Sequence, residues 1–415
     1  MGIIMVDKIL EEAREVPVIG SYDVVIAGGG IAGVSAALAA ARAGSTVCLL
    51  EKACALGGLA TIGNVIVYLP LCDGLGHQVS AGISEELLLL SVDDEPEPIP
   101  ELHIKPVPEA WCKGGNIEDR IKERYFTGFN PVTYYYKLER LLLKNKVKLY
   151  FDTRFSTVCK EGTRITAVLV ENKSGRCAIR CKAVVDATGD ADVCAAAGEK
   201  TVSLSSNVCC GWYYYIDSGQ VKLACFTKPF DSQGRRLPSS GRNFRGDQAD
   251  QVTAMLLDSR KLTMQDLKTR TAGSAGRAFP IMLPQIPCFR MTRRLAGRRV
   301  LRESDNRRWF ENTLGMIGDW RSPGPVYCLP LEILAAVSTA NLITAGRCIS
   351  SAGRAWDVTR VIQACAVTGQ AAGTAAAFLA LDCLQSFQDI DTRTLQKYLQ
   401  KQNVIINPKL LQMHN

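Results

Sequence analysis

The fold is decided by residues 23–51, which read DVVIAGGGIAGVSAALAAARAGSTVCLLE. The apolar run Val24–Ala27 predicts a buried strand, and it leads directly into the glycine-rich hexapeptide GGGIAG at 28–33. The small and apolar residues that follow predict a helix that ends at Gly44, and Thr46–Leu50 predicts a second strand. The order of strand, glycine loop, helix and strand is typical of a nucleotide-binding α/β unit.

Each glycine of the loop has a separate physical purpose in such a unit. Gly28 permits the tight turn, Gly30 lets a pyrophosphate approach the backbone, and Gly33 allows close contact between helix and strand. Glu51 follows the second strand, where a carboxylate accepts hydrogen bonds from a ribose. A glycine-rich turn in another kind of α/β protein is the alternative, but the complete unit favours a dinucleotide site.

Three further segments decide whether the dinucleotide is FAD or NAD. The sequence GGLAT at 57–61 resembles the stretch that follows the ribose acid in flavoproteins with two dinucleotide-binding domains. ATGD at 187–190 resembles the second motif of that class, and TAGR at 344–347 ends a third apolar strand. Many flavoproteins have Gly-Asp at the last position, where this chain has Gly346 and Arg347. Together these segments predict non-covalently bound FAD.

The chain resembles the bacterial and archaeal FAD-dependent oxidoreductase family that includes the flavin subunit of heterodisulfide reductase. The resemblance is strongest at GGLATIGNV (57–65), VVDATGDADVCAAAG (184–198), NLITAGRCIS (341–350) and TGQAAGTAAA (368–377). It implies that a helix beginning near residue 360 faces the flavin. The cofactor contacts that it implies are Gly28, Gly30, Ile31, Ala32, Gly33, Glu51, Lys52, Gly57, Gly58, Leu59, Thr61, the main chain near Phe155, Ala187, Thr188, Gly189, Gly346, Arg347, Arg360, Val361 and Ile362.

The expected fold class is α/β, with two domains built from separated segments. Residues 20–65, 133–200 and 336–385 should form a Rossmann-like FAD-binding domain of glutathione-reductase type, with a parallel sheet, helices and a small β-meander. Residues 66–132 and 201–335 should form an α+β substrate or cap domain, followed by a C-terminal helix and tail at 386–415.

The sequence also predicts several local elements of secondary structure and one irregular stretch. Residues 5–14 are expected to form a short polar helix, and Cys177–Cys181 and Ala183–Asp186 two separate strands. The stretch from 200 to 335 reads as irregular, with an aromatic run at Trp212–Tyr215 that either lines the substrate pocket or fills the core.

Composition indicates a globular cytoplasmic protein without a metal site. The chain has 16 cysteines but no CxxC pair, and only three histidines. We therefore expect reduced thiols, and leave open only the adjacent Cys209–Cys210 pair and Cys72 as redox-active groups. The charged N-terminal stretch does not resemble a signal peptide, and the most apolar window, 24–41, contains the glycine loop, so no membrane association is expected. The net charge of +8 is compatible with an anionic substrate or with nucleic acid.

Three side chains are candidates for catalysis. Eight arginines lie between Arg290 and Arg308, and Arg290 and Arg293, placed beside a predicted Phe289–Met291 strand, could bind an anionic substrate above the flavin. Interdomain salt bridges are the alternative for both. His77 follows a glycine-rich loop and is the candidate general base.

The predicted function is hydride transfer between FAD and a small organic substrate, anionic in one interpretation. A flavin electron-transfer subunit with a redox partner protein is the first alternative, although iron–sulfur cysteine spacing is absent. Modification of RNA is the second, but basic and aromatic residues do not alternate as at RNA sites. The single GxGxxG loop predicts no dedicated nicotinamide site.

Overall fold

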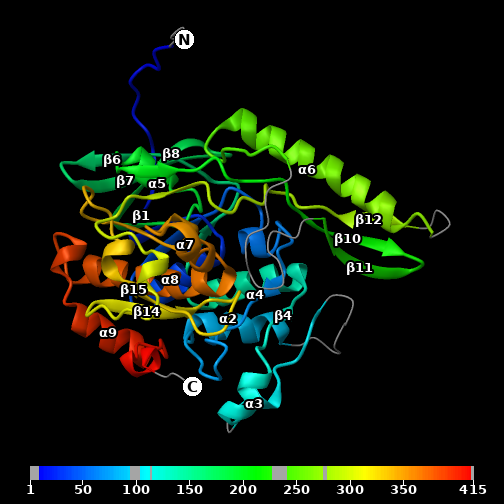
Figure 1. Cartoon of the computed structure of the whole chain (residues 1–415). Coiled ribbons are helices and arrows are strands. Elements are labelled where there is room, and N and C mark those ends of the chain that lie inside the picture. The colour runs from blue at the N-terminus through cyan, green and yellow to red at the C-terminus, as the bar shows by residue number, and fades with distance from the viewer. Residues whose placement is uncertain (1–8, 94–102, 113–114, 227–240, 274–277, 413–415) are drawn as a thin grey trace, which may run out of the picture.

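The computed structural model describes residues 9–93, 103–112, 115–226, 241–273 and 278–412. Its main sheet has seven strands in the order β5-β2-β1-β8-β7-β6, and β16 pairs with β8 beside them (Figure 1). Strands β1, β2, β5, β8 and β16 run parallel, whereas β6, β7 and β8 form an antiparallel extension. The strands are β1 (Val18–Ala27), β2 (Val47–Leu50), β5 (Lys148–Tyr150), β6 (Arg154–Glu161), β7 (Arg164–Asn172), β8 (Gly175–Asp186) and β16 (Leu342–Thr344).

Both faces of the parallel part are buried, which explains the continuous apolar run at the end of β1. Val24 and Ile26 belong to one hydrophobic cluster, and Val25 and Ala27 belong to a second cluster on the opposite face. Because successive side chains of a strand point to opposite faces, every residue of this run must be apolar. Burial of both faces fixes the position of β1 in the sheet up to its end, directly before Gly28.

Two helices made of small residues, α1 (Ile31–Arg42) and α8 (Ile362–Leu381), pack closely against each other. A Cβ on Gly369 would lie 2.3 Å from the carbonyl oxygen of Ala32, and one on Gly373 would lie 2.1 Å from that of Ala36. The helices therefore touch backbone to backbone at these positions. Helix α8 is long and apolar enough to cross a membrane, but 83% of its most apolar window is buried inside the structure, as in the core helix of a globular protein.

The remaining elements surround this core (Figure 1). The other helices are α2 (Ile83–Val92), α3 (Ile117–Lys122), α4 (Pro131–Lys144), α5 (Asp192–Ala196), α6 (Ala249–Arg270), α7 (Gly353–Thr359) and α9 (Thr392–Lys401). Four small sheets pair β3 (Val67–Tyr68) with β4 (Thr127–Gly128), β9 (Thr201–Ser203) with β13 (Arg293–Leu295), β14 (Thr313–Gly318) with β15 (Val326–Pro330), and β10 (Trp212–Asp217) with both β11 (Gln220–Cys225) and β12 (Phe279–Met282).

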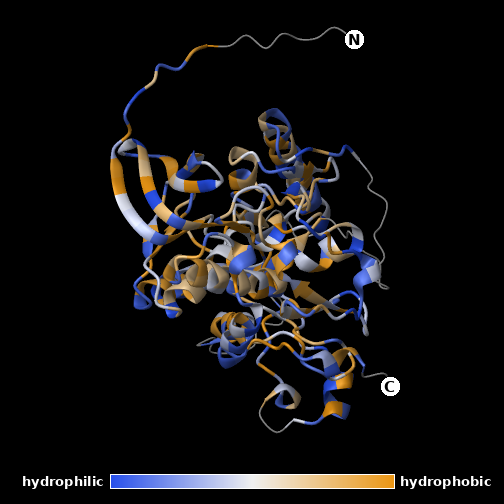
Figure 2. Cartoon of the chain, turned by 90° about the vertical axis from the view of Figure 1, so that its left-hand side faces the viewer, coloured by the Kyte–Doolittle hydropathy of each residue, from blue (hydrophilic) through white to orange (hydrophobic). Residues whose placement is uncertain are grey.

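Four local predictions were wrong. Residues 9–14 form no helix and extend away from the body of the chain (Figure 1 and Figure 2), and Ile9 and Leu10 are almost fully exposed; the rest of the predicted helix lies outside the described residues. The two strands predicted between 177 and 186 are one strand, β8, and residues 289–291 are not a strand. Most unexpectedly, the irregular stretch contains the 22-residue helix α6.

Candidate functional site

A cavity of about 580 Å³ lies where β1, β2, β8 and β16 end and where α1 and α8 begin. Its size is typical of cofactor pockets, and the carboxyl ends of parallel strands are where α/β sheets bind their ligands. All but three of the predicted cofactor residues line it: Gly28, Gly30, Ile31, Ala32, Glu51, Lys52, Gly57, Gly58, Leu59, Phe155, Ala187, Thr188, Gly189, Gly346, Arg347, Arg360 and Ile362. The exceptions, Gly33, Thr61 and Val361, lie directly beside lining residues.

Three of the four glycines of the loop, Gly28, Gly30 and Gly33, differ in their surroundings. A Cβ on Gly28 would lie 2.4 Å from the carbonyl oxygen of Ala187, and one on Gly33 would lie 1.8 Å from that of Gly28. Both positions therefore require glycine for packing. Gly30 is different, because its φ of −65° suits any residue and, within the described part of the chain, a Cβ there would meet no atom within 4 Å apart from its chain neighbours.

The open space at Gly30 therefore faces the cavity, and a side chain there would fill the cavity instead of clashing with the protein. It lies at the start of α1, whose first N–H groups and positive dipole end attract anions. No side chain caps this helix end. This is the arrangement that a pyrophosphate requires, and the residues of the loop fit a bound dinucleotide.

Glu51 is held at the end of β2 by main-chain hydrogen bonds. The N–H of Gly29 donates to Oε2 and the N–H of Ala53 donates to Oε1, each at 2.7 Å. Burial raises the pKa of Glu51, while these two N–H groups and Lys52 oppose that shift. The carboxylate thus fixes the glycine loop, and Glu51 also lines the cavity.

Replacement of Glu51 by Ala should weaken FAD binding by about 1–3 kcal/mol, because the ribose loses the charged acceptor that the sequence assigns to it. Glu51→Gln keeps one acceptor oxygen and should weaken binding less. The dissociation constant of FAD from the apoprotein, followed by quenching of flavin fluorescence, measures both. Glu171→Ala, on the exposed part of β7, is the control and should leave affinity unchanged; equal affinities for all three variants would contradict the placement of Glu51.

A buried carboxylate and a buried thiol hold the second motif in place. Asp186 accepts hydrogen bonds from the N–H and hydroxyl of Thr188 and from the N–H of Cys194. The sulfur of Cys348 lies 3.1 and 3.2 Å from the N–H groups of Gly189 and Ala191. Burial and the neighbouring Asp186 raise the pKa of Cys348 well above its usual range, so this thiol stays neutral and structural.

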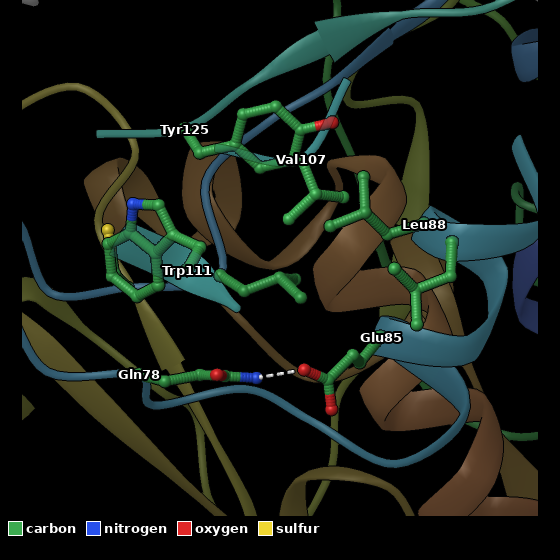
Figure 3. Close-up of a pocket in the computed structure, with 9 residues that line it drawn as sticks. Gln78, Glu85, Leu88, Val107, Trp111 and Tyr125 are labelled. Atoms are coloured by element: carbon green, nitrogen blue, oxygen red, sulfur yellow. Dashed lines mark hydrogen bonds between the residues drawn. The ribbon is translucent and has the colours of Figure 1, made fainter. Parts of the chain in front are cut away.

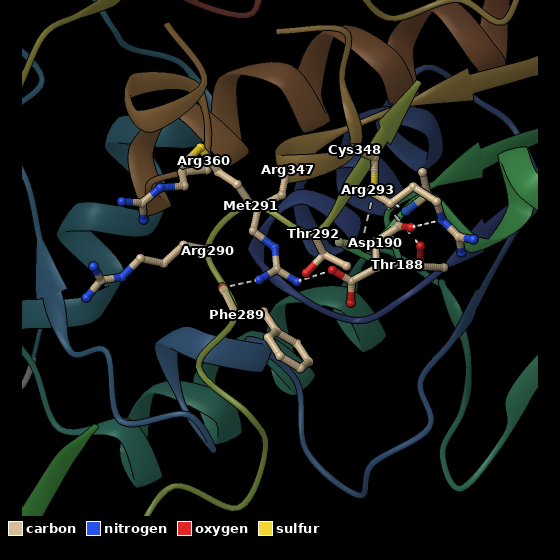
Figure 4. Close-up of polar contacts among 12 residues, drawn as sticks. Thr188, Asp190, Phe289, Arg290, Met291, Thr292, Arg293, Arg347, Cys348 and Arg360 are labelled. Atoms are coloured by element: carbon tan, nitrogen blue, oxygen red, sulfur yellow. Dashed lines mark hydrogen bonds and ion pairs between the residues drawn. The ribbon is translucent and has the colours of Figure 1, made fainter. Parts of the chain in front are cut away.

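Two predicted arginines are tied to the acidic residues of this motif (Figure 4). Arg293 donates to the carbonyl oxygen of Asp190 at 2.8 Å and to the carboxylate of Asp192 at 2.6 Å. Arg347 donates to the carbonyl oxygen of Phe289 and lies 3.3 Å from the carboxylate of Asp190. Desolvation and the nearby Asp190 raise the pKa of Asp192 to about 6, although half of its side chain is open to solvent. Both arginines line the cavity and connect separate segments of the chain through these contacts. For Arg293, a salt bridge of this kind is the alternative to substrate binding that the sequence analysis gave.

Arg360 occupies a different end of the cavity, immediately before α8. Its Nε and Nη2 donate to Asp357 at 3.2 and 3.0 Å. Asp357 also faces Arg321, and Arg321 pairs with the fully buried Asp319. This ion-pair network fixes the guanidinium of Arg360 on the cavity wall.

The structure does not bring Arg290 or His77 onto the wall of this cavity. The Arg290 side chain points the same way as Arg360 in Figure 4, and it lies beside Cys210. His77 Nδ1 lies 3.1 Å from Asp73. Its neighbour Gln78 lines a separate small cavity of about 50 Å³ with Cys72, where Gln78 donates to Glu85 (Figure 3).

Sequence reasoning missed several lining residues. They are Thr153 and Arg154 beside Phe155, Asp190 at the end of the second motif and Asp192 just after it, the start of α6 with the residues before it (246–249, Val252, Thr253), Ile286, Pro287, Phe289 and Cys365. Asp190 and Asp192 could have been proposed from the sequence, because one ends the recognised motif and the other lies two residues beyond it. The α6 segment was not, because no motif marks it and nothing in the sequence places it over the cavity.

A family model described as FAD dependent oxidoreductase matches residues 23–203 and 244–399. The match covers the glycine loop, the second motif and α8, and therefore most of the cavity wall. This chain belongs to the FAD-dependent oxidoreductase family. It is an FAD-dependent enzyme, and its α/β domain is the Rossmann-like domain expected of such flavoproteins. A comparison with curated proteins gave no match.

Solved structures resemble the chain only distantly. A geranylgeranyl bacteriochlorophyll reductase-like protein from Thermoplasma acidophilum is 13% identical, with a TM-score of 0.44 over 94% of this chain and 90% of that one. The p-nitrophenol 4-monooxygenase PnpA from Pseudomonas putida DLL-E4 is 10% identical, with a TM-score of 0.42 over 91% and 83%. A 3-ketosteroid-delta4-(5alpha)-dehydrogenase from Rhodococcus jostii RHA1 is 14% identical, with a TM-score of 0.41 over 87% and 97%. Scores this low add nothing to the family assignment.

Proposed function

We propose that this oxidoreductase transfers a hydride between non-covalently bound FAD and a small organic anion. The observation that carries the choice of an anion is Arg360, a guanidinium on the cavity wall that Asp357 holds in place. Arginine is the side chain best matched to carboxylate and phosphate. The bound flavin supplies the hydride chemistry, and the protein's task is to bind and orient the substrate.

The placement of the cofactor in this proposal follows from the two ends of the cavity. Glu51, Thr153 and Phe155 would hold the adenosine end, and the open space at Gly30 would hold the pyrophosphate. The flavin would then lie toward Gly346, Arg360 and the start of α8. That helix has 20 residues and no acidic residue in its first turn, so its positive dipole end favours negative charge there.

The neighbouring side chains define how a substrate would be held. Arg360 lies one residue before the N-cap of α8, so its guanidinium and the helix dipole both attract an anion at this end of the cavity. Asp357 keeps the guanidinium in one orientation. Ile62, Ile286 and Phe289 provide apolar wall elsewhere in the same cavity, and apolar lining strengthens ionic interactions inside a cavity by lowering the local dielectric constant.

We also propose that the nucleotide-binding domain is of the glutathione-reductase type. The support is the antiparallel extension of β6, β7 and β8 beside the parallel strands, because it supplies the expected small β-meander. It also places Phe155 of β6 on the cavity wall next to Thr153 and Arg154, on the side assigned to adenine.

Replacement of Arg360 by Gln should weaken the binding of small carboxylates at least tenfold. The removal of one charge-assisted pair costs about 1.5–3 kcal/mol. Acetate and succinate, titrated into the holoprotein, should perturb the visible flavin spectrum with saturation, whereas ethylamine should not. Arg308→Gln alters an arginine that is mostly exposed and does not line the cavity, and it should behave as wild type. A stronger response to the amine, or identical titrations for Arg360→Gln and wild type, would refute the proposal.

A further inference from the structure

Two buried cysteines from distant parts of the sequence meet just behind the cavity wall. Cys210 precedes β10, and Cys288 lies between β12 and β13. The sulfur of Cys210 lies 3.3 Å from the carbonyl oxygen of Cys288, and the sulfur of Cys288 lies 3.4 Å from the carbonyl oxygen of Gly63. Both residues are buried and both thiols are free.

The adjacent Cys209 points elsewhere. Its sulfur lies 3.9 Å from the carbonyl oxygen of Met255 in α6, and it packs with Phe244 and Phe289. The structure therefore separates the two neighbours in sequence and pairs Cys210 with Cys288 instead of Cys209. The fold therefore does not favour a disulfide between residues 209 and 210.

The two cysteines lie next to residues that line the FAD cavity. Pro287 and Phe289, on either side of Cys288, both line the cavity, and so does Ile62, which precedes Gly63. Arg360, which we place near the flavin, also acts electrostatically on Cys210. The two thiols thus lie at the end of the cavity that the proposed function assigns to the flavin.

The surroundings favour a thiolate on Cys210. The neighbouring Cys288 thiol lowers the pKa of Cys210 to about 6, helped by the positive charges of Arg290 and Arg360 against the effect of burial. The same interaction, together with burial, raises the pKa of Cys288 well above its usual range. The remaining buried cysteines near the cavity behave differently, since burial raises the pKa of Cys365 to about 12. A thiolate beside a protonated thiol is the form from which disulfide chemistry starts.

We propose that Cys210 and Cys288 form a redox-active dithiol that exchanges two electrons with the bound FAD. On oxidation a sulfur–sulfur bond forms between the Cys210 thiolate and the Cys288 thiol, Cys288 gives up its proton, and the two electrons and this proton pass to the oxidised flavin. On reduction the same bond breaks, Cys210 returns to the thiolate and Cys288 regains its proton, and the two electrons and the proton come from the reduced flavin. This inference rests on the position of the flavin in the proposed function. It adds to that function a dithiol beside the flavin that can hold two electrons.

The first test is a thiol map of the wild-type holoprotein. The protein is treated under anaerobic conditions with a stoichiometric amount of diamide, quenched in acid, alkylated and digested. Mass spectrometry should find a Cys210–Cys288 disulfide and alkylated Cys209. A Cys209–Cys210 link, or alkylated Cys210 and Cys288 after full oxidation, would overturn the proposal. This result does not depend on the substrate or on Arg360.

The second test counts electrons in the same diamide-oxidised holoprotein. Anaerobic titration with dithionite should consume two two-electron equivalents per flavin in wild type and in the control Cys209→Ser. Cys210→Ser and Cys288→Ser should each consume one, with flavin still bound. If wild type consumes one equivalent although the disulfide is present, the pair does not exchange electrons with the flavin, and the proposal fails while carboxylate binding at Arg360 stands.

Discussion

Replacement of Gly30 by Val is expected to raise the dissociation constant for FAD by at least about a hundredfold, which corresponds to about 2.7 kcal/mol. The valine methyl groups would occupy the space that we assign to the pyrophosphate. The backbone at Gly30 already has a conformation that any residue adopts, and no atom of the described residues other than its chain neighbours lies within 4 Å of the new Cβ. The apoprotein should therefore fold with wild-type stability, so the loss is one of binding alone. Flavin fluorescence titration of the apoprotein measures it.

Gly33→Ala provides the matched comparison. Its Cβ would lie 1.8 Å from a backbone oxygen of Gly28, so the whole strand–loop–helix turn must shift. This variant should lose thermal stability before flavin is added, whereas Gly30→Val should not. A Gly30→Val protein that keeps full flavin occupancy, or that unfolds as readily as Gly33→Ala, would show that the loop does not hold a pyrophosphate.

Gly373→Val should strongly lower the free energy of unfolding. The new Cβ would lie 2.1 Å from the carbonyl oxygen of Ala36 and 2.7 Å from its Cα, so α8 must move away from α1. Overpacking of a buried contact costs about 3 kcal/mol or more when only backbone atoms are available to give way. That is a large part of the stability of an ordinary domain, about 5–15 kcal/mol. Urea unfolding followed by circular dichroism measures the change.

The control for this prediction is Gly273→Val at the exposed end of the turn after α6. Among the residues that the structure describes, no atom beyond its chain neighbours lies within 4 Å of its Cβ, and the free energy of unfolding should change by less than about 0.5 kcal/mol. Similar losses for Gly273→Val and Gly373→Val would mean that α1 and α8 do not touch as closely as the structure shows.

The sequence was informative wherever backbone geometry demands a particular residue. Gly28 and Gly33 are required by contacts that no side chain tolerates, and the run Val24–Ala27 is apolar because both faces of the strand are buried. Such constraints are local, so the order of strand, loop, helix and strand and most of the cavity wall could be predicted. The family assignment and the FAD cofactor followed from the same residues.

The parts that depend on tertiary contacts could not be predicted. Helix α6 buries only Met255, Thr263 and Leu267 along 22 residues, so its amphipathic pattern is too weak to recognise. The pairing of Cys210 with Cys288 joins segments 78 residues apart, whereas the sequence suggested only the adjacent Cys209 as a partner for Cys210. His77 and Arg290 show the same limit, because only the folded chain shows that neither of them lines the cavity.

The central claim is that this cavity holds FAD with its pyrophosphate at Gly30 and its flavin ring beside α8. A crystal structure of the holoprotein tests it most directly. The account predicts adenosine at Glu51 and Phe155, pyrophosphate over the start of α1, and the flavin ring within contact distance of Arg360 and Ile362, with no covalent bond to the chain. Density for FAD in the reverse orientation, outside this cavity, or covalently attached would contradict it.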